Sequence, residues 1–357
     1  MKRNVLSLAI FSLILALSFA GHSVDKKRTH VLSTQTKQTQ TPKPLPETKK
    51  LTNDYHIFQS FNNCGPASLS MMLSYFGIEK NQEELGEALR PYQNEDGIND
   101  DKSVTMDEIA GKAAEFDLIA YHRPNGDSEL IKQFIANDIP VLIRAWMSEE
   151  EDIGHYRIVK GYDTRTKTTI QDDPIKGKDL IYTDETFTTL WEKFNFEYVV
   201  LVPKEKKQLA EDIIGEDKDQ HVAWQNAVLL SQKKLEKNPD DIYSRFNLSV
   251  AYYNLGEYHK TVTEYEKIAG QLPFRTLWYQ IEPLLAYYEL GHDEKVLELT
   301  DHILSNENAA FAELYLLRGK IYEKQKNLEL AKQAFAYAIL YNKHLKEAQK
   351  SYNKIAS

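Results

Sequence analysis

Hydrophobic residues between positions 53 and 203 follow two different periods, one typical of helices and one typical of strands. Helical spacing predicts a helix from Cys64 to Gly77 and two more helices over 105–116 and 127–136. This mixture predicts an α+β domain over residues 53–203. Short apolar or alternating runs predict its strands at 140–146, 154–162, 168–173, 180–182 and 197–202.

From residue 221 to residue 357 the pattern is wholly helical and repeats at an interval of 35 residues. Such a fixed period, with two helices in each unit, predicts a solenoid of helical hairpins. The segment 247–258 resembles a tetratricopeptide repeat, although Lys326 replaces the expected glycine in the last unit. Stacked hairpins form a groove, so the resemblance implies a possible protein partner there. Equivalent positions are Tyr252, Tyr287 and Tyr322; Tyr258, Asp293 and Leu328; Thr261, Val296 and Ala331; and Gly256 with Gly291.

Segments outside these two domains lack their periodicity. Two basic residues precede an apolar run over 5–20, which predicts a signal peptide at 1–20 and export to the cell envelope or the extracellular space. The alternative is an uncleaved anchor, and only then would the protein be held at a membrane. Residues 21–52 are polar, basic and rich in Thr, Gln and Pro, which predicts a disordered spacer. The charged stretch 204–220 is predicted to be a linker between the domains.

Composition removes several classes of function. The first fifty residues hold nine Lys and Arg against two Asp and Glu, which leaves 35 against 51 and a net charge of −16 for the rest. A body this acidic disfavours a phosphate backbone, so nucleic acid is not expected as a partner. The single cysteine excludes a disulfide framework and any site with several thiolate ligands. The histidines form no His-Glu-x-x-His motif, so neither a metal nor a cofactor is expected.

The one cysteine lies where a reactive thiol is expected. Cys64 follows Asn62 and Asn63, which can cap a helix, and it precedes a helical run. A helix N-terminus favours the thiolate form of a cysteine. Gln59 lies a few residues upstream, where its amide can stabilise an oxyanion. The alternative for Cys64 is a buried structural cysteine.

A cysteine nucleophile needs a base and a group that orients the base. His155 lies in a strand-like run and shares one face of it with Arg157. The strand-like run 168–173 follows after a short, turn-rich connection, which predicts a hairpin. Asp172 and Asp173 at its end are both candidates to orient His155, because a slip of one residue reverses the face of a strand.

The order of these motifs resembles the papain-like cysteine peptidases related to the bacteriocin-processing, double-glycine leader peptidases. The shared pattern is a Gln, an Asn-Cys-Gly-Pro that opens a helix, a Gly-His-Tyr before a Gly-Tyr-Asp turn, and an Asp-Pro. The resemblance implies that Cys64 is the nucleophile, His155 the general base and acid, and Asp173 the group that orients it. It also implies that Gln59 serves the oxyanion hole. Asp172 remains the alternative to Asp173.

The sequence therefore predicts an exported cysteine peptidase, a thiol hydrolase that cleaves a peptide or protein amide bond through a Cys-His-Asp triad. The predicted fold class is an α+β papain-like cysteine peptidase domain followed by an all-α tetratricopeptide-like helical repeat domain that recruits a partner or substrate. The alternative is a non-catalytic scaffold with a papain-like fold that binds a peptide or protein. A reactive pair of Cys64 and His155 distinguishes the two, because a scaffold needs no such pair.

Overall fold

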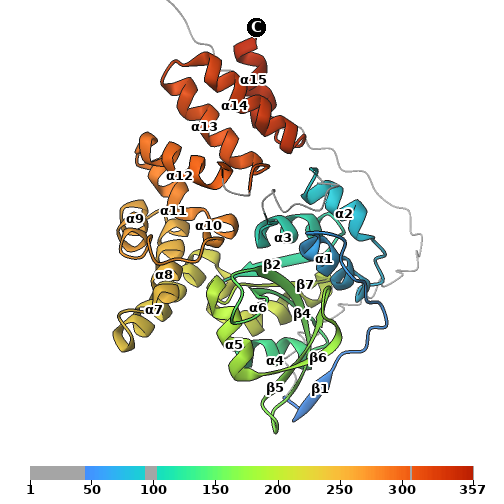
Figure 1. The fold of residues 1–357 in the computed structure, drawn as a ribbon. Coiled ribbons are helices and arrows are strands. Elements are labelled where there is room, and N and C mark those ends of the chain that lie inside the picture. The colour runs from blue at the N-terminus through green and yellow to red at the C-terminus, as the bar shows by residue number, and fades with distance from the viewer. Residues whose placement is uncertain (1–44, 93–102, 306–307, 357) are drawn as a thin grey trace, which may run out of the picture. The chain divides into compact units, whose positions relative to one another are not determined.

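A single antiparallel sheet forms the centre of the first domain (Figure 1). The computed structural model describes residues 45–92, 103–305 and 308–356, so the predicted signal peptide and most of the predicted spacer lie outside it. Within those residues seven strands pair in the order β2-β7-β3-β4-β5-β6, and β1 pairs with the part of β4 that extends past β3. The strands are β1 (Thr48–Lys50), β2 (Ile119–Arg123), β3 (Val141–Trp146), β4 (Gly154–Asp163), β5 (Thr168–Asp173), β6 (Gly177–Thr183) and β7 (Tyr198–Val202).

Helices cover both faces of this sheet, which is why its central strands are apolar at nearly every position. Leu142 of β3 packs on the face covered by α1, α2 and α3, whereas its neighbour Val141 packs on the face covered by α4, α5 and α6. Each fully buried aliphatic side chain stabilises the fold by roughly 1.5–3 kcal/mol. The helices are α1 (Cys64–Ser74), α2 (Gln82–Leu89), α3 (Met106–Ala114), α4 (Ser128–Ala136), α5 (Asp184–Trp191) and α6 (Lys207–Ile214), with short 3-10 turns at Glu192–Phe194, Lys204–Lys206 and Gly215–Lys218.

Two predicted boundaries change. Strand β1 lies inside the predicted spacer 21–52, and Leu51 is buried, so the folded domain begins before residue 52. The sequence Thr-Lys-Lys has no apolar alternation, and only its pairing with β4 makes it a strand. The predicted linker 204–220 contains α6, whose Leu209 and Ile214 pack into the core of the α+β domain. The high charge of this stretch belongs to the exposed face of an amphipathic helix.

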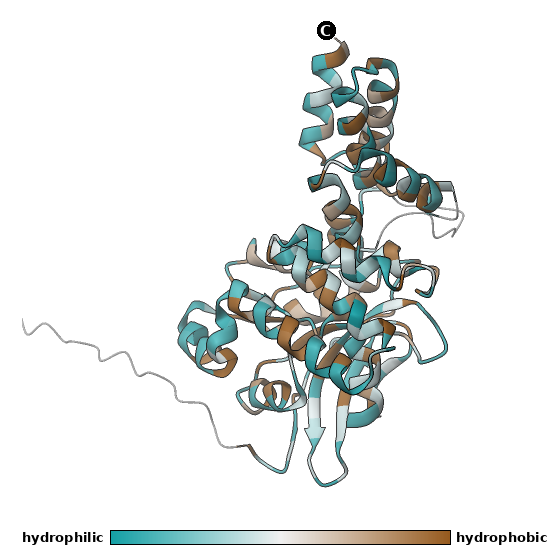
Figure 2. Ribbon diagram, turned by 90° about the vertical axis from the view of Figure 1, so that its left-hand side faces the viewer, coloured by the Kyte–Doolittle hydropathy of each residue, from teal (hydrophilic) through white to brown (hydrophobic). Residues whose placement is uncertain are grey.

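The predicted period of 35 residues coincides with the helix starts of the second domain, which is all-helical. The second helix of each hairpin begins at Tyr258, Asp293 or Leu328. Helices of this domain alternate hydrophobic and hydrophilic stretches, as helices that pack on one side do (Figure 2). One turn into these second helices the equivalent residues are completely buried: Thr261, Val296 and Ala331. The helices are α7 (Gln220–Lys237), α8 (Ile242–Asn254), α9 (Tyr258–Glu266), α10 (Thr276–Tyr279), α11 (Glu282–Glu289), α12 (Asp293–Ser305), α13 (Ala312–Lys324), α14 (Leu328–Tyr341) and α15 (Lys346–Ala356).

Helix α10 is an addition to the regular hairpins, because it lies between α9 and α11, whereas the described residues between α12 and α13, 308–311, form no helix. The repeat domain contacts the α+β domain through this helix, where Arg275 pairs with Asp152. It also does so through α8, where Asn247 accepts a hydrogen bond from the Asn195 backbone N–H at 3.2 Å. Among the described helices, none combines the length and the apolar composition needed to cross a membrane.

Candidate active site

Cys64 is the first residue of α1 and is 8% exposed. Asn63 occupies the N-cap position, but its side chain does not cap the helix as predicted. Its Oδ1 instead accepts a hydrogen bond from Arg90 Nη1 at 3.0 Å, and its Nδ2 donates to Ser60 Oγ at 2.9 Å. A Cβ on Gly86 of α2 would lie 3.1 Å from the same Oδ1, so the glycine allows the close approach. Contacts between α1 and α2 therefore fix the position of Cys64.

Cys64 and His155 line the same cavity, and the imidazole stabilises the thiolate form of the cysteine. Burial raises the pKa of Cys64, but the bond to His155 and the positive charges of His155 and Arg90 outweigh burial and lower this pKa overall. A hydrogen bond from the backbone N–H of Tyr156 acts in the same direction. Burial lowers the pKa of His155, whereas its bonds to Asp173 and Cys64 raise it overall. The environment therefore favours a thiolate beside an imidazolium.

Asp173 holds the other side of the imidazole. His155 Nε2 lies 2.8 Å from Asp173 Oδ1, which leaves Nδ1 as the ring nitrogen for the thiol. The carboxylate also accepts hydrogen bonds from the backbone N–H groups of Ile175 and Lys176 at 2.7 and 2.9 Å and from Arg157 Nε at 2.8 Å. Burial raises the pKa of Asp173, but these donors hold it well below its usual range. Asp173 is therefore ionised and fixed in place.

Asp172 contacts a different group. Its Oδ1 lies 2.7 Å from Lys160 Nζ and accepts a hydrogen bond from the backbone N–H of Asp179 at 2.9 Å. Lys160 is completely buried and also pairs with the Asp179 carboxylate at 2.6 Å. Of the two aspartates, the structure brings Asp173 to His155 and places Asp172 in a buried cluster around a lysine.

Gln59 lies at the same cavity as the thiol. Its backbone N–H donates to the Pro174 carbonyl at 2.8 Å, which ties the segment before α1 to the turn after β5. Its Oε1 is buried and has no hydrogen-bond partner among the described residues. The cavity measures about 50 Å³, and Gln59, Asn62, Cys64, Ser103, Met147, Ile153, Gly154, His155, Ile175, Trp278 and Tyr279 line it.

Sequence reasoning missed the role of Arg157. Its guanidinium is 1% exposed and donates to Asp173 and to the backbone carbonyls of Trp146 and Met147, the latter two at 3.0 and 2.8 Å. It therefore ties the end of β3 to the carboxylate that holds the histidine. The predicted strand pattern placed Arg157 on the face of His155, and that was the available signal for its role.

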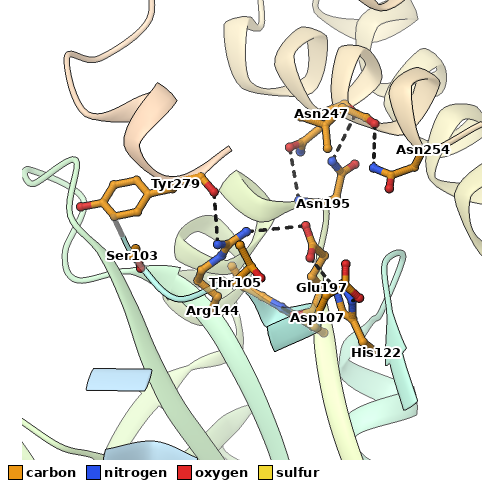
Figure 3. A network of polar contacts seen from close by, with 12 residues as sticks. Ser103, Thr105, Asp107, His122, Arg144, Asn195, Glu197, Asn247, Asn254 and Tyr279 are labelled. Atoms are coloured by element: carbon orange, nitrogen blue, oxygen red, sulfur yellow. Dashed lines mark hydrogen bonds and ion pairs between the residues drawn. The ribbon is translucent and has the colours of Figure 1, made fainter. Parts of the chain in front are cut away.

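Trp278 and Tyr279 were also missed, because they belong to α10 of the repeat domain and lie more than a hundred residues from His155. No local pattern connects them to the thiol. Figure 3 shows the Tyr279 ring on the side of Ser103, another residue of the cavity wall, while the Tyr279 carbonyl faces Arg144. The repeat domain therefore supplies part of the cavity.

A second polar network surrounds the buried His122 (Figure 3). His122 is held between Asp107 at its Nδ1 and Glu197 at its Nε2, both at 2.6 Å. Burial lowers the pKa of His122, but the two carboxylates raise it to about 9. Arg144 lies 3.9 Å from Glu197 and donates to the Tyr279 carbonyl at 3.4 Å, so this network reaches the repeat domain.

The α+β domain has the fold of a papain-like cysteine peptidase, and a helical repeat domain follows it. Residues 36–199 match the family described as Peptidase_C39 like family. The match confirms the resemblance that the motifs around Cys64 and His155 predict. A comparison with curated proteins found no match.

Similar solved structures fall into two groups. A C39-like peptidase from Bacillus anthracis is 19% identical, with 44% of this chain and 99% of that chain covered and a TM-score of 0.36. The peptidase domain of Streptococcus ComA, a bifunctional ABC transporter of a quorum-sensing pathway, is 19% identical over 44% of this chain and 98% of its own, with a TM-score of 0.32. MamA, whose match covers 40% of this chain and 92% of its own, is 15% identical with a TM-score of 0.33.

Proposed function

We propose that the protein is an exported cysteine peptidase that hydrolyses a peptide or protein amide bond. The observation that supports it best is that the only thiol, Cys64, shares a cavity with His155, whose Nε2 lies 2.8 Å from the buried carboxylate of Asp173. A buried polar group costs about 1–3 kcal/mol when it is unsatisfied, so a scaffold gains nothing from such an arrangement. A nucleophile, a base and an orienting carboxylate in contact are what acyl transfer requires.

The reaction proceeds by two acyl transfers. The Cys64 thiolate attacks the substrate carbonyl carbon, which forms a C–S bond and places negative charge on the carbonyl oxygen. The backbone N–H of Cys64 and the side-chain amide of Gln59 donate hydrogen bonds to this oxyanion. His155 gives its proton to the departing amine as the C–N bond breaks. Water then attacks the thioester, His155 accepts one of its protons, and the C–S bond breaks to release the carboxylic acid product and regenerate the Cys64 thiolate beside the protonated His155.

The pKa shifts predict the pH range of activity. The attacking state needs an ionised Cys64 and a protonated His155. The pKa of Cys64 is lowered and that of His155 is raised, so the two shifts favour the coexistence of thiolate and imidazolium. The rate is expected to rise as pH increases through the lowered pKa of Cys64 and to fall as pH increases through the raised pKa of His155.

Export and partner recruitment complete the proposal. Its support for export is the apolar run over residues 5–20, which has the length and flanks of a signal peptide. Its support for recruitment is the stack of helical hairpins from α7 to α15, an architecture that presents a groove to peptides or partner helices.

Alkylation of the thiol tests the catalytic pair. The rate of Cys64 labelling by iodoacetamide, followed by mass spectrometry across pH, is expected to have a midpoint well below about 8.5, the value of a free thiol. His155→Ala is expected to return the midpoint toward that value, whereas His259→Ala, at an exposed position on α9, leaves it unchanged. An ordinary midpoint that is indifferent to His155 contradicts the proposal and favours a binding scaffold.

Peptide cleavage tests the reaction itself. A pooled peptide library is incubated with the protein, and new termini are identified by mass spectrometry. Cleavage is expected with the unmodified protein and is expected to be lost in Cys64→Ser. A reactive thiol that cleaves no library peptide would leave the thiolate–imidazole pair in place and reject the peptidase assignment.

A further inference from the structure

Helix α10 of the repeat domain is fixed beside the histidine strand. The Arg275 backbone N–H and Nη1 donate to the two carboxylate oxygens of Asp152 at 3.0 and 2.7 Å. At the other end of the helix, the Tyr279 carbonyl accepts a hydrogen bond from Arg144 of β3 at 3.4 Å. Contacts at both ends therefore hold this four-residue helix against the segment that leads into β4.

The Tyr279 ring packs against Gly154, the residue before His155. A Cβ on Gly154 would lie 3.1 Å from carbons of this ring and 3.1 Å from the Phe194 ring, so a larger residue would push the phenol away. Burial raises the pKa of Tyr279 to about 12, and the charge of Cys64 adds to this rise. Tyr279 and Cys64 line the same cavity.

We propose that Trp278 and Tyr279 of the repeat domain form one wall of the thiol cleft and determine which substrates reach Cys64. The inference rests on the proposed peptidase function and names the specificity determinants of the same site. Both residues line the cavity that Cys64, His155 and Gln59 line from the α+β domain. The repeat domain thus acts in selection at the site itself, in addition to any partner that it recruits.

The dimensions of the cavity explain why these rings select by size. Its volume is about 50 Å³, whereas pockets for small-molecule ligands span about 300–1,000 Å³. A peptide that brings its carbonyl carbon to the thiol must enter this cavity, which Trp278 and Tyr279 help to line. Only small side chains next to the scissile bond fit this space while Tyr279 remains in place. Removal of the ring admits larger side chains.

Thiol reagents of two sizes test the wall independently of peptide cleavage. The alkylation rate of Cys64 is measured with iodoacetamide and with the bulkier N-phenylmaleimide. Tyr279→Ala is expected to raise the rate ratio of the bulky to the small reagent by about tenfold or more, the usual effect of a changed pocket wall. Tyr279→Phe keeps the ring and is expected to keep the wild-type ratio. Tyr258→Ala, a partly buried repeat tyrosine at the start of α9, is the matched control.

A substitution in the opposite direction protects the test from a folding defect. If Tyr279→Ala does not unfold cooperatively, Tyr279→Trp is used in its place. Its larger ring is expected to lower the rate ratio of the bulky to the small reagent. Ratios equal to that of the unmodified protein in folded variants overturn the proposal.

A library of peptides that vary only the residue before the scissile bond supplies the second readout. Tyr279→Ala is expected to raise kcat/KM for bulky residues relative to glycine and alanine by about tenfold. An unchanged preference in a folded, active variant overturns the specificity role. If neither the unmodified protein nor any variant cleaves a peptide but the reagent ratio changes as expected, the peptidase function is rejected and the role of Trp278 and Tyr279 in access to Cys64 is supported. If peptides are cleaved and neither ratio changes, the function stands and the wall fails.

Discussion

At the scale of single residues, Asp172 and Asp173 are adjacent in the chain but stabilise different cations. Asp173 accepts hydrogen bonds from His155 and Arg157, whereas Asp172 pairs with the buried Lys160. Both carboxylates are almost completely buried, so neither can lose its partner without cost. Of the two, only Asp173 contacts His155, so only its substitution is expected to change the pKa of the thiol in addition to the stability.

Asp173→Asn and Asp172→Asn are expected to give opposite results. Asp173→Asn removes the charge that raises the pKa of His155, so the pKa of Cys64 is expected to rise and hydrolysis to fall by about 10²–10⁴-fold. Asp172→Asn is expected to lower the free energy of unfolding by on the order of 3 kcal/mol, because Lys160 loses one of its two carboxylate partners, and to leave the pKa of Cys64 unchanged. Alkylation across pH and urea unfolding measure the two effects. A change in the pKa of Cys64 in Asp172→Asn but not in Asp173→Asn would contradict this assignment.

How far the site could be predicted depends on how local its signals are. Cys64 and His155 lie in short sequence motifs that can be recognised without knowledge of the fold. The strand pattern alone left Asp172 and Asp173 open, and only the resemblance favoured Asp173. The register of β5 is irregular with both β4 and β6, so simple alternation along the strand does not identify the side chain that faces His155. Tyr279 reaches the cavity only because α10 docks on the α+β domain, and no motif in the sequence around Tyr279 indicates this contact.

At the scale of elements, the turn between the two helices of each hairpin repeats one backbone conformation. Gly256 and Gly291 have φ of 75° and 74°, and Lys326 occupies the equivalent position with φ of 62°. This left-handed region is open to glycine but costs other residues roughly 1–2 kcal/mol. The turn at Lys326 thus keeps the backbone conformation of the other two turns, although its sequence has lost the glycine.

Lys326→Gly is therefore expected to stabilise the repeat domain by about 0.5–1 kcal/mol, after the entropic cost of a glycine in the unfolded chain is deducted. Gly256→Ala is the converse control, because a Cβ there meets no atom within 4 Å and only the backbone conformation is disfavoured. Its expected effect is a loss of similar size. Urea unfolding measures both, and a Lys326→Gly protein no more stable than the original would show that this turn relaxes its backbone without strain.

Most helices and strands were predictable because their hydrophobic periods are strong, as in β3, β7 and the second helices of the hairpins. Two of the elements that were missed have weak periods of their own. Strand β1 is a polar tripeptide that pairs with β4, and α10 is a single helical turn held by Arg275 and Arg144. Both exist because of tertiary contacts, which override local propensity.

At the scale of the whole molecule, the two domains share a buried polar network that contains an unusual carboxyl group. Glu282 begins α11 of the repeat domain, and although the residue is partly exposed, its Oε2 is buried without a hydrogen-bond partner among the described residues. Burial raises the pKa of Glu282 to about 7, and the negative charges of Glu197 and Asp107 in the α+β domain add to the rise. Arg144 opposes it.

The stability of the docked domains is therefore expected to depend on pH through Glu282. The pKa is about 7 in the folded state and about 4.3 in an unfolded chain. Between these values the folded state binds more protons, so this residue lowers stability as pH rises from about 4.3 to about 7. Glu282→Gln mimics the protonated form and is expected to unfold at nearly the wild-type temperature at pH 5 but at a higher temperature at pH 8, a gain on the order of 2 kcal/mol.

Thermal unfolding of both proteins at the two pH values checks this expectation. The pKa of His122 is raised to about 9, so the stabilisation from its protonated form is also lost as pH rises from about 6.5 to about 9. This loss is the same in the unmodified protein and in Glu282→Gln, so it cancels when the two are compared. Alkylation of Cys64 is expected to be the same in both, because Glu282 does not contribute to the lowered pKa of the thiol. A gain of equal size at pH 5 and pH 8 would mean that Glu282 stays ionised at both, and that water or a rearranged Arg144 satisfies its carboxylate at the boundary between the domains.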